Sequence, residues 1–509
     1  MLWIALHLPA LSLESFAATL GPAQAGQPAA LVEAQRIVQA DALARSRGVL
    51  PGQKRITALA LVPELVLGQA DARRDAQALL AVAHVALAFT PAVVAEGVAG
   101  THGVQLEVQA SLRYFGGLDA LLQRLMAALQ PLGHQLQWAS APTALGAALL
   151  ARWQPGGPHI THLTALRERL DGAPVWLLGP GREHWEALQG MGLRTLADLR
   201  ALPRSGLARR FGPELLQGLD RARGDAPQPQ RWVELAPRFC SRIELFTRAD
   251  RSDQVLAGAR ILLARLVAWA QAQHGRIARF TLHLHHERYQ RTRDDSTEQP
   301  LPASTALEIA LAEPALAPAH LQMLLAERLG HLPLLAPALE LSLQCDALVP
   351  AEAPNGELFP SRSSARTGLT RLIERLQARL GREQVRCLEP VAEHRPELAT
   401  RSMPADLQPG GLHQPQPAAA LQLTRPVWLC VEPQALPEQA SRPCLDGRPL
   451  QLLAGPERIE AGWWDGGLAA RDYFIAEASD GALVWIYRAR MPPAAGEAGS
   501  GWFLHGRFA

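Results

Sequence analysis

The sequence has few of the residues that build covalent or metal-stabilised frameworks. Its 509 residues include five cysteines, and no two of them have the Cys-x-x-Cys spacing of a zinc or redox site. An odd number of scattered cysteines excludes a disulfide framework. Lysine is nearly absent, since Lys54 is the only one among 50 basic residues. Because arginine is therefore common throughout the chain, a single arginine is weak support for a binding site.

The chain also has little net charge and no long apolar run. A net charge of +2 excludes a strong overall field that would attract a polyanion, so any nucleic-acid surface has to be local. The apolar segment Leu2–Leu8 is too short for a signal peptide or a membrane span. We therefore expect a reduced, cytoplasmic protein without membrane contact. A hydrophobic fraction of 48% over 509 residues allows three or more domains.

The segment 102–117 predicts a short, half-buried strand that ends before a helix. Val104, Leu106 and Val108 alternate with polar residues, which is the period of a strand. A second strand is predicted over Leu2–Leu8. Short buried strands often deliver catalytic groups at their ends, but no carboxylate stands at the ends of these two. The residues at those ends are His7, Pro9, His102 and Gly103.

Helical periodicity surrounds these two strands. Arg73–Leu87 and Leu118–Leu129 each have one apolar face, and Ala34–Ser46 is also predicted to be a helix. Strand, helix, strand and helix in this order favour an α/β layer, with an insertion at about residues 20–75.

Residues 183–224 have the pattern of a helix-hairpin-helix DNA-binding motif. Short helices are joined at Gly190-Met191-Gly192, and such turns present backbone N–H groups to a DNA phosphate. A plain turn in a helical bundle explains the same pattern, so both interpretations stay open. The candidate DNA-binding residues here are Gly190, Gly192, Arg204, Arg209 and Arg210.

Residues 239–346 predict a split βαβ module in the order β-α-β-β-α-β. We expect its open face to carry Arg242 and Arg279, together with His283 and His285, in positions suited to phosphate contacts. A metal site at these histidines and His286 lacks an acidic or cysteine partner at ligand spacing, so we predict none. The predicted elements are strands at Phe239–Phe246, Arg276–Glu287, Thr305–Leu311 and Leu339–Cys345, and helices at Asp253–His274 and Pro318–Leu329.

The last third of the chain alternates between linkers and short ordered segments. Arg366–Leu380 predicts an amphipathic helix with an apolar face at Leu369, Leu372, Ile373, Leu376 and Leu380. Asp480-Gly481 between two alternating runs is a strong hairpin signal. Residues 421–509 are rich in tryptophan and β-like. Their aromatic side chains could form a core or a docking surface, and we expect most of them to form a core.

These segments together resemble a Y-family translesion DNA polymerase, and specifically its ImuB-type relatives from bacterial mutagenesis cassettes. The motifs are SLRYFGG at 111–117, GPERIEAGWWDGG at 455–467, RDYFIAE at 471–477 and WFLHGRF at 502–508. The resemblance implies an α+β multidomain fold with palm, fingers, thumb, little finger and a small β-rich C-terminal domain. The implied boundaries are 1–20 and 75–170 for the palm, 21–74 for the fingers, 171–232 for the thumb, 233–346 for the little finger, 347–420 for a linker and 421–509 for a partner-binding domain.

The resemblance also locates a polymerase centre that this chain has lost. Active members carry an Asp-x-Asp-like pair and an Asp-Glu pair, and these fall on His7, Pro9, His102 and Gly103. Their Tyr-x-x-Arg contact to the triphosphate falls on Ala42 and Arg45, and their phosphate-binding lysine falls near Ala148.

Two-metal phosphoryl transfer needs carboxylates, because Mg²⁺ binds oxygen ligands and binds imidazole poorly. Glu14, Glu96 and Glu107 are the only acids that could replace the lost ones. Glu14 lies far along its helix, and we expect Glu107 in the middle of its strand. We predict no catalytic residues, no metal and no cofactor.

Asn355-Gly356-Glu357-Leu358-Phe359 lies where ImuB-type proteins carry a peptide that binds the β sliding clamp. Asn355, Leu358 and Phe359 are the candidate clamp residues, because two large apolar side chains in a linker suit a preformed groove. Asparagine in place of the usual glutamine is a departure from the pattern, and a staple onto the little finger is the alternative.

The resemblance implies four partners: DNA, the sliding clamp, a RecA-like cassette protein and an error-prone replicative-type polymerase. The last two are expected to bind after residue 360. We predict a non-catalytic adaptor for damage-induced mutagenesis in the SOS response, at the nucleoid. The alternatives are an active translesion polymerase with displaced carboxylates and a stand-alone DNA-structure-binding protein.

Overall fold

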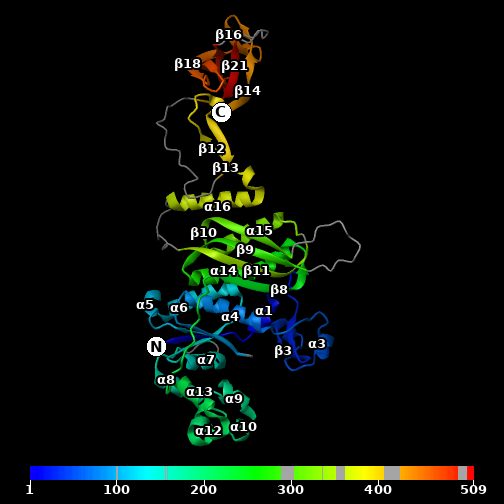
Figure 1. Cartoon of the computed structure of the whole chain (residues 1–509), viewed down its shortest axis with the longest axis vertical. Helices are drawn as coiled ribbons and strands as arrows, with labels where there is room; N and C mark the ends of the chain where they lie inside the picture. The colour runs from blue at the N-terminus through cyan, green and yellow to red at the C-terminus, as the bar shows by residue number, and fades with distance from the viewer. Residues whose placement is uncertain are drawn as a thin grey trace. The chain divides into compact units, whose positions relative to one another are not determined.

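The computed structural model describes residues 1–98, 101–154, 156, 159–287, 303–334, 336–350, 362–405, 425–490 and 501–508 (Figure 1). The chain divides into two compact units, Met1–Thr367 and Gly368–Ala509.

A four-stranded antiparallel sheet in the order β5-β6-β1-β7 lies at the centre of the first unit. His7 pairs with Gly103 across β1 and β6, and Gly103 pairs with Glu96 across β6 and β5. The predicted strand ends therefore lie side by side at one end of the sheet. We call this end, with His7, Pro9, His102 and Gly103, the palm edge. The strands are β1 (Trp3–His7), β5 (Val93–Val98), β6 (Thr101–Glu107) and β7 (Gln137–Ala141).

The alternation of β1 divides its side chains between two hydrophobic cores. Ile4 and Leu6 pack with α4 and α6 on one face, whereas Trp3 and Ala5 pack with α7 on the other. The four leucines predicted on one face of α6, including Leu121 and Leu125, are all buried. The helices are α1 (Leu11–Ala17), α4 (Ala72–Leu87), α6 (Leu118–Leu129) and α7 (Ala144–Trp153).

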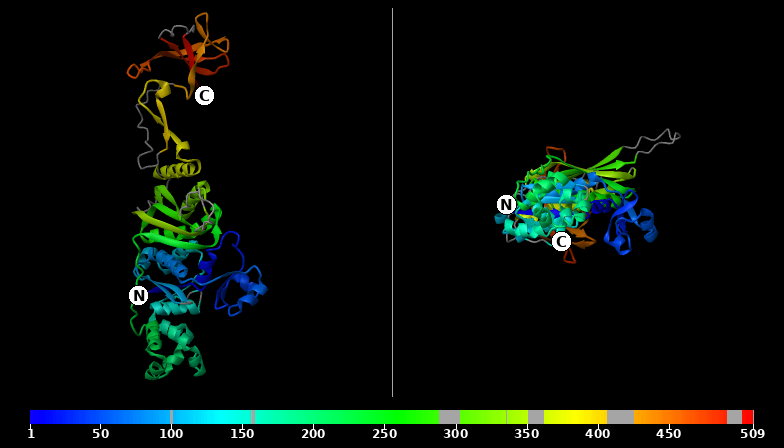
Figure 2. Two further views of the ribbon diagram at one scale, coloured as in Figure 1. Left: turned by 45° about the vertical axis from the view of Figure 1, so that its right-hand side comes forward. Right: turned by 90° about the horizontal axis from the view of Figure 1, so that it is seen from below.

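A small sheet in the order β3-β2-β4 is inserted between α1 and α4 and lies beside the palm-like sheet, as both views show (Figure 2). The predicted single helix over Ala34–Ser46 is wrong. Ala34 and Gln35 have positive φ values of 47° and 62° and form a tight turn, after which Ile37 is buried in a strand. Asp41 then accepts a hydrogen bond from the N–H of Ala44 and caps α2. The elements are β2 (Ala29–Glu33), β3 (Arg36–Ala40), α2 (Ala42–Ser46), α3 (Arg55–Leu61) and β4 (Val66–Gly68).

Six short helices follow α7 and form a thumb-like bundle. Their leucines, including Leu196 and Leu215, join the core that begins under Trp3. The helices are α8 (Leu163–Asp171), α9 (Gly179–Glu183), α10 (Trp185–Gly190), α11 (Leu196–Ala201), α12 (Arg204–Phe211) and α13 (Pro213–Arg223).

The split βαβ module has the predicted order, and its sheet runs β10-β9-β11-β8. α14 is long and apolar enough to span a membrane, but 67% of its most apolar window is buried inside the protein, as in a core helix. One turn of α14 faces the palm, where Arg265 donates hydrogen bonds to Gln77 of α4 and Ser241 of β8. The elements are β8 (Phe239–Ala249), α14 (Ser252–Ala272), β9 (Gly275–His286), β10 (Ser304–Ala315), α15 (Pro318–His331) and β11 (Ala338–Pro350).

The second unit contains most of α16 (Arg362–Leu380), the β12–β13 hairpin and a five-stranded sheet. The predicted apolar face of α16 is exposed at four of its five positions, including Leu369 and Leu372, because the helix buries Thr370 and Glu374 instead. The predicted hairpin at Asp480-Gly481 is confirmed, with Gly481 at a φ of 84°. The main strands are β12 (Arg386–Pro390), β13 (Thr400–Pro404), β14 (Trp428–Leu436), β18 (Gln451–Ala461), β19 (Ala469–Glu477), β20 (Leu483–Ala489) and β21 (Trp502–Arg507).

Candidate functional site

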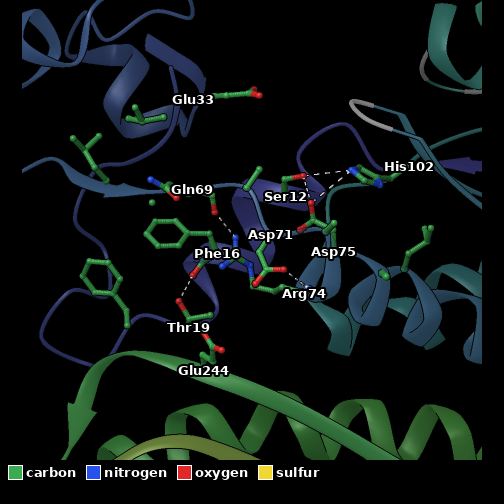
Figure 3. A pocket seen from close by; sticks show the side chains of 18 of the residues that line it. Ser12, Phe16, Thr19, Glu33, Gln69, Asp71, Arg74, Asp75, His102 and Glu244 are labelled. Atoms are coloured by element: carbon green, nitrogen blue, oxygen red, sulfur yellow. Dashed lines mark hydrogen bonds and ion pairs between the residues drawn. The ribbon is translucent and has the colours of Figure 1, made fainter. Parts of the chain in front are cut away.

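An open cavity of about 1680 Å³ lies between α1, α4, the inserted sheet and β8 (Figure 3). Apolar side chains such as Phe16 and Phe246 line one part, and a polar group lines another. The polar group contains Ser12, Arg74, Asp75 and His102. His102, which stands where the resemblance expects a catalytic acid, therefore lines this cavity.

Asp75 organises the polar group, as Figure 3 shows. Its carboxylate accepts hydrogen bonds from the hydroxyls of Ser12 at 2.5 Å and Ser15 at 2.7 Å. Nε2 of His102 lies 3.3 Å from the Ser12 Oγ and 3.9 Å from the Asp75 Oδ2. Arg74 donates a hydrogen bond to Ser15 and places its guanidinium carbon 5.6 Å from the ring centre of Phe16. These contacts join β6, α1 and α4.

The two degenerate histidines are held in the neutral form. Burial lowers the pKa of His102, although the nearby Asp75 opposes this change. Burial also lowers the pKa of His7, whose Nδ1 lies 3.2 Å from the carbonyl oxygen of His102. Nδ1 of His102 is buried and has no hydrogen-bond partner among the described residues. Both shifts favour the neutral imidazole at this end of the sheet.

The three acids considered as replacements are engaged elsewhere. Glu14 accepts hydrogen bonds from the N–H of Gln135 and lies 3.0 Å from Nδ1 of His134. Glu107 accepts hydrogen bonds from the N–H groups of Leu2 and Gln109. It is the last residue of β6, so its predicted place in the middle of the strand is wrong.

Glu96 is the remaining acid near this edge. It accepts a hydrogen bond from Gln105 at 3.1 Å, and burial raises its pKa, while Arg152 opposes this change. Burial lowers the pKa of Arg152 itself to about 10. Arg152 also donates hydrogen bonds to the carbonyls of Ala148 and Leu177, so Ala148 contacts an arginine one turn along the same helix.

The residues at this edge do not fit a pair of magnesium ions. In the described part of the chain, no three His, Cys, Asp or Glu side chains converge as metal ligands. Positions 7, 9, 102 and 103 offer two imidazoles, a proline and a glycine, whereas Mg²⁺ requires several oxygen ligands. A Cβ atom at Gly103 would lie 3.1 Å from the carbonyl oxygen of Leu6, which is closer than an ordinary van der Waals contact.

The backbone N–H groups of the helix-hairpin-helix turn are used within the turn itself. The N–H of Gly192 donates to Gln189, and that of Met191 donates to Ala187. The N–H of Leu193 donates to Leu188, and those of Arg194 and Thr195 both donate to the carboxylate of Asp198 and lower its pKa. A carboxylate of the protein therefore occupies the place where this motif presents N–H groups to a phosphate.

The predicted basic residues of the thumb-like bundle differ in whether they are free to contact a phosphate or are paired with an acid of the protein. Arg204 donates two hydrogen bonds to Asp220, at 3.0 and 2.5 Å. Arg209 and Arg210 are exposed on the same helix, and Gly190 is the exposed last residue of α10.

The four residues predicted on the open face of the split βαβ sheet do share that face. His283 pairs with Ser342, which pairs with Arg242, so these residues form one row. Arg242 lies 3.1 Å from Glu340, and Arg279 lies 3.3 Å from Glu308. These carboxylates neutralise the arginines that were predicted to contact phosphate. The candidate clamp residues Asn355, Leu358 and Phe359 lie outside the described residues.

Sequence reasoning missed Asp75 and its serine partners. The available signal was an acid on the apolar face of a helix, one turn before Ala78 and Leu79, where unpaired charges are rare. Its partner Ser12 lies 63 residues away, so only the folded chain identifies the pairing.

The antiparallel palm-like sheet with its inserted three-stranded sheet, the helical bundle and the split βαβ module form an α+β fold with the arrangement expected from the resemblance to a Y-family polymerase. A β-rich C-terminal unit follows. The chain is a homologue of Protein ImuB from two strains of Caulobacter vibrioides, NA1000/CB15N and ATCC 19089/CB 15. Both are 28% identical over 489 residues, which cover 91% of this chain and 100% of the relatives. The chain is therefore similar to ImuB, a polymerase-like protein, over almost its whole length.

Solved structures of Y-family polymerases are also similar. They include a Dbh ternary complex at 14% identity and DinB from Sulfolobus solfataricus at 13%. Each match covers 69% of this chain and 100% of the other, with a TM-score of 0.37. No family model matches the sequence.

Proposed function

We propose that this protein is a non-catalytic adaptor in damage-induced, error-prone translesion DNA synthesis. The main support for this proposal is the set of residues at and near the palm edge. Four positions lack carboxylates, and Asp75 and the three candidate replacement acids are each bound to other groups of the protein. Such an edge retains the scaffold of a polymerase without the ligands for two-metal chemistry.

DNA, the sliding clamp, a RecA-like protein and an error-prone replicative-type polymerase are the proposed partners. Arg209 and Arg210 support the DNA contact because both are exposed and adjacent on one helix. Leu358 and Phe359 are the proposed clamp anchors. The site of action is the nucleoid in the cytoplasm.

The test of this function is the frequency of damage-induced mutations in cells that depend on this protein. We expect Leu358→Ala/Phe359→Ala to reduce that frequency to the uninduced level and to abolish binding in a clamp pull-down. Glu96→Gln removes the carboxylate that lies in the same paired row as His7, and we expect it to leave the frequency unchanged. Mutagenesis that needs Glu96 but not the clamp anchors would contradict the adaptor function.

The second candidate is an active polymerase with displaced carboxylates. Asp75 favours it, since this acid lies in the cavity within 3.9 Å of His102. Rotating Asp75 toward a metal ion would break the hydrogen bonds that it accepts from the hydroxyls of Ser12 and Ser15, which opposes this candidate. A stand-alone DNA-structure-binding protein is the third candidate, and an intact clamp interaction would exclude it.

A further inference from the structure

The loop between β18 and β19 exposes two neighbouring tryptophans. We name residues 462–468 the Trp loop. Trp463 is 74% exposed and Trp464 is 57% exposed, and their rings meet edge to face at 5.4 Å. Trp485 and Trp502 of the same sheet are buried, as predicted for most aromatic residues of this region. Trp463 and Trp464 are exceptions to this expected core position.

A buried arginine fixes the loop from inside. Arg395 is 5% exposed, and its guanidinium donates two hydrogen bonds to Asp465, at 3.1 and 2.6 Å. It also donates to the carbonyl of Gly467 at 3.1 Å and to Glu393 at 2.8 Å. Its central carbon lies 5.8 Å from the ring centre of Trp464. Charge-assisted hydrogen bonds at both ends of the guanidinium hold the loop in one conformation.

The glycines of the loop are required for this closure. Gly462 has a φ of 81°, and a Cβ atom there would collide with the carbonyl oxygen of Gly467. A Cβ atom at Gly467 would lie 2.7 Å from Nη1 of Arg395. A buried arginine and close packing at two glycines therefore hold the loop so that two indole rings are exposed to solvent. Rigid, exposed tryptophans of this kind act as anchors in protein interfaces, where they bind with little loss of conformational entropy.

The charges around the loop distinguish a protein partner from a nucleic acid. Five arginines support the loop, Arg395 and four on strands β18 to β20 with the residue after them, and four of the five are ion-paired: Arg395 with Glu393 and Asp465, Arg458 with Asp472, Arg471 with Glu397, and Arg490 with Glu460. The fifth, Arg488, is exposed and lies opposite Asp472 in the sheet. Binding of single-stranded nucleic acid combines stacking with several unpaired cations along the backbone, and among these five described arginines only Arg488 has no ion pair.

We propose that the Trp loop anchors a protein partner that carries an apolar pocket. The inference rests on the proposed adaptor function and assigns one of its interaction surfaces. Trp463 and Trp464 enter the pocket, while the ion-paired residues beneath them hold the loop in place.

The test measures binding of the full-length chain to three purified probes: the RecA-like protein, the error-prone polymerase and a single-stranded oligonucleotide. We expect Trp463→Ala/Trp464→Ala to weaken binding to one of the two proteins by about 30-fold or more, the size of a hot-spot loss. Asp465→Asn keeps both indoles but loosens the loop, and we expect a smaller loss for the same protein. Trp428→Ala is the matched control, because this tryptophan is 68% exposed on β14, and we expect it to bind as the wild type does.

Equal binding of both proteins by the wild type and the double variant would overturn this inference while leaving the adaptor function intact. If the double variant loses the oligonucleotide and keeps both proteins, the loop binds nucleic acid and the inference is wrong. If the wild type binds neither protein, the adaptor function fails and the inference fails with it. Far-UV circular dichroism and unchanged thermal unfolding establish that the variants fold.

Discussion

At the scale of single residues, the palm edge is defined by acids that bind the protein itself. Asp75 accepts hydrogen bonds from two serines, Glu107 from two backbone N–H groups, and Glu14 from one. A carboxylate that binds a catalytic metal directs its oxygens at that metal, and the hydrogen bonds of these acids take up part of the acceptor capacity that a metal would need. The same contacts make them structural residues whose loss has a measurable cost.

We expect Asp75→Ala to lower the free energy of unfolding by about 2–3 kcal/mol, because two hydroxyls lose their shared buried acceptor. Denaturation of the full chain in urea measures the change. Glu33→Gln is the control, since this exposed acid lines the same cavity, and we expect a change within about 0.5 kcal/mol. Equal stability of Asp75→Ala and the wild type would show that the serine contacts are not formed.

His84 gives the protein a pH dependence that is independent of the palm edge. Burial lowers its pKa from 6.5 to about 4. The unfolded chain therefore takes up a proton between pH 6.5 and pH 4 that the folded chain does not, so stability is lost as the pH falls through that window. We expect the wild type to lose about 2 kcal/mol more than His84→Leu between pH 7 and pH 5. Parallel pH profiles for the two proteins would contradict this burial.

At the scale of elements, the two candidate DNA surfaces are partly neutralised. On the open face of the split βαβ sheet, Arg242 and Arg279 form ion pairs with acids. In the turn between α10 and α11, the carboxylate of Asp198 accepts hydrogen bonds from two backbone N–H groups. Helix α12 is different, because Arg209 and Arg210 are exposed on it. DNA binding by this protein is therefore expected to depend on a few unpaired arginines.

We expect Arg209→Ala/Arg210→Ala to weaken binding of a primer–template duplex by about tenfold and to reduce the slope of its salt dependence by about two. Fluorescence anisotropy at several salt concentrations measures both quantities. Arg204→Ala serves as the control on the same helix, because Arg204 is paired with Asp220. If Arg204→Ala weakened DNA binding as much as the double variant does, Arg209 and Arg210 would not be the specific phosphate contacts.

The helices and strands also show how much of the fold could be predicted from the sequence. The strands of the palm and the split βαβ module were predictable because their apolar residues alternate strictly, as Phe280, Leu282 and Leu284 do in β9. The helix predicted at Ala34–Ser46 was wrong, because pairing with β2 and burial of Ile37 outweighed a local alanine-rich composition. The face of α16 was also wrong, since its contact through Gln377 to Ala405 turns a polar stripe inward.

The candidate site was less predictable than the fold. His7, Pro9, His102 and Gly103 could be located from strand ends, but the reason for their inertness lies in contacts between distant segments. Ser12 and Asp75 meet across 63 residues, and no local pattern indicates such a pair. The exposure of Trp463 and Trp464 depends likewise on Arg395, which is 70 residues from Asp465.

At the scale of the whole molecule, the division into two compact units separates two kinds of surface. The polymerase-like unit, Met1–Thr367, contains the palm edge and the exposed arginines of α12, whereas Gly368–Ala509 contains the Trp loop. We expect a chain ending at residue 350 to bind primer–template DNA within about threefold of the full chain and to lose both protein partners. Loss of DNA binding in this shorter chain would contradict the separation.

The central claim is that the palm is a retained scaffold without polymerase chemistry, and primer extension by the full-length protein tests it most directly. The assay uses a primed template with all four deoxynucleotides and either Mg²⁺ or Mn²⁺, in parallel with Asp75→Asn, Glu96→Gln and Glu107→Ala. We predict no extension by any of the four proteins with either metal. Template-directed incorporation by the wild type that one of these substitutions abolishes would contradict the claim and identify the displaced carboxylate.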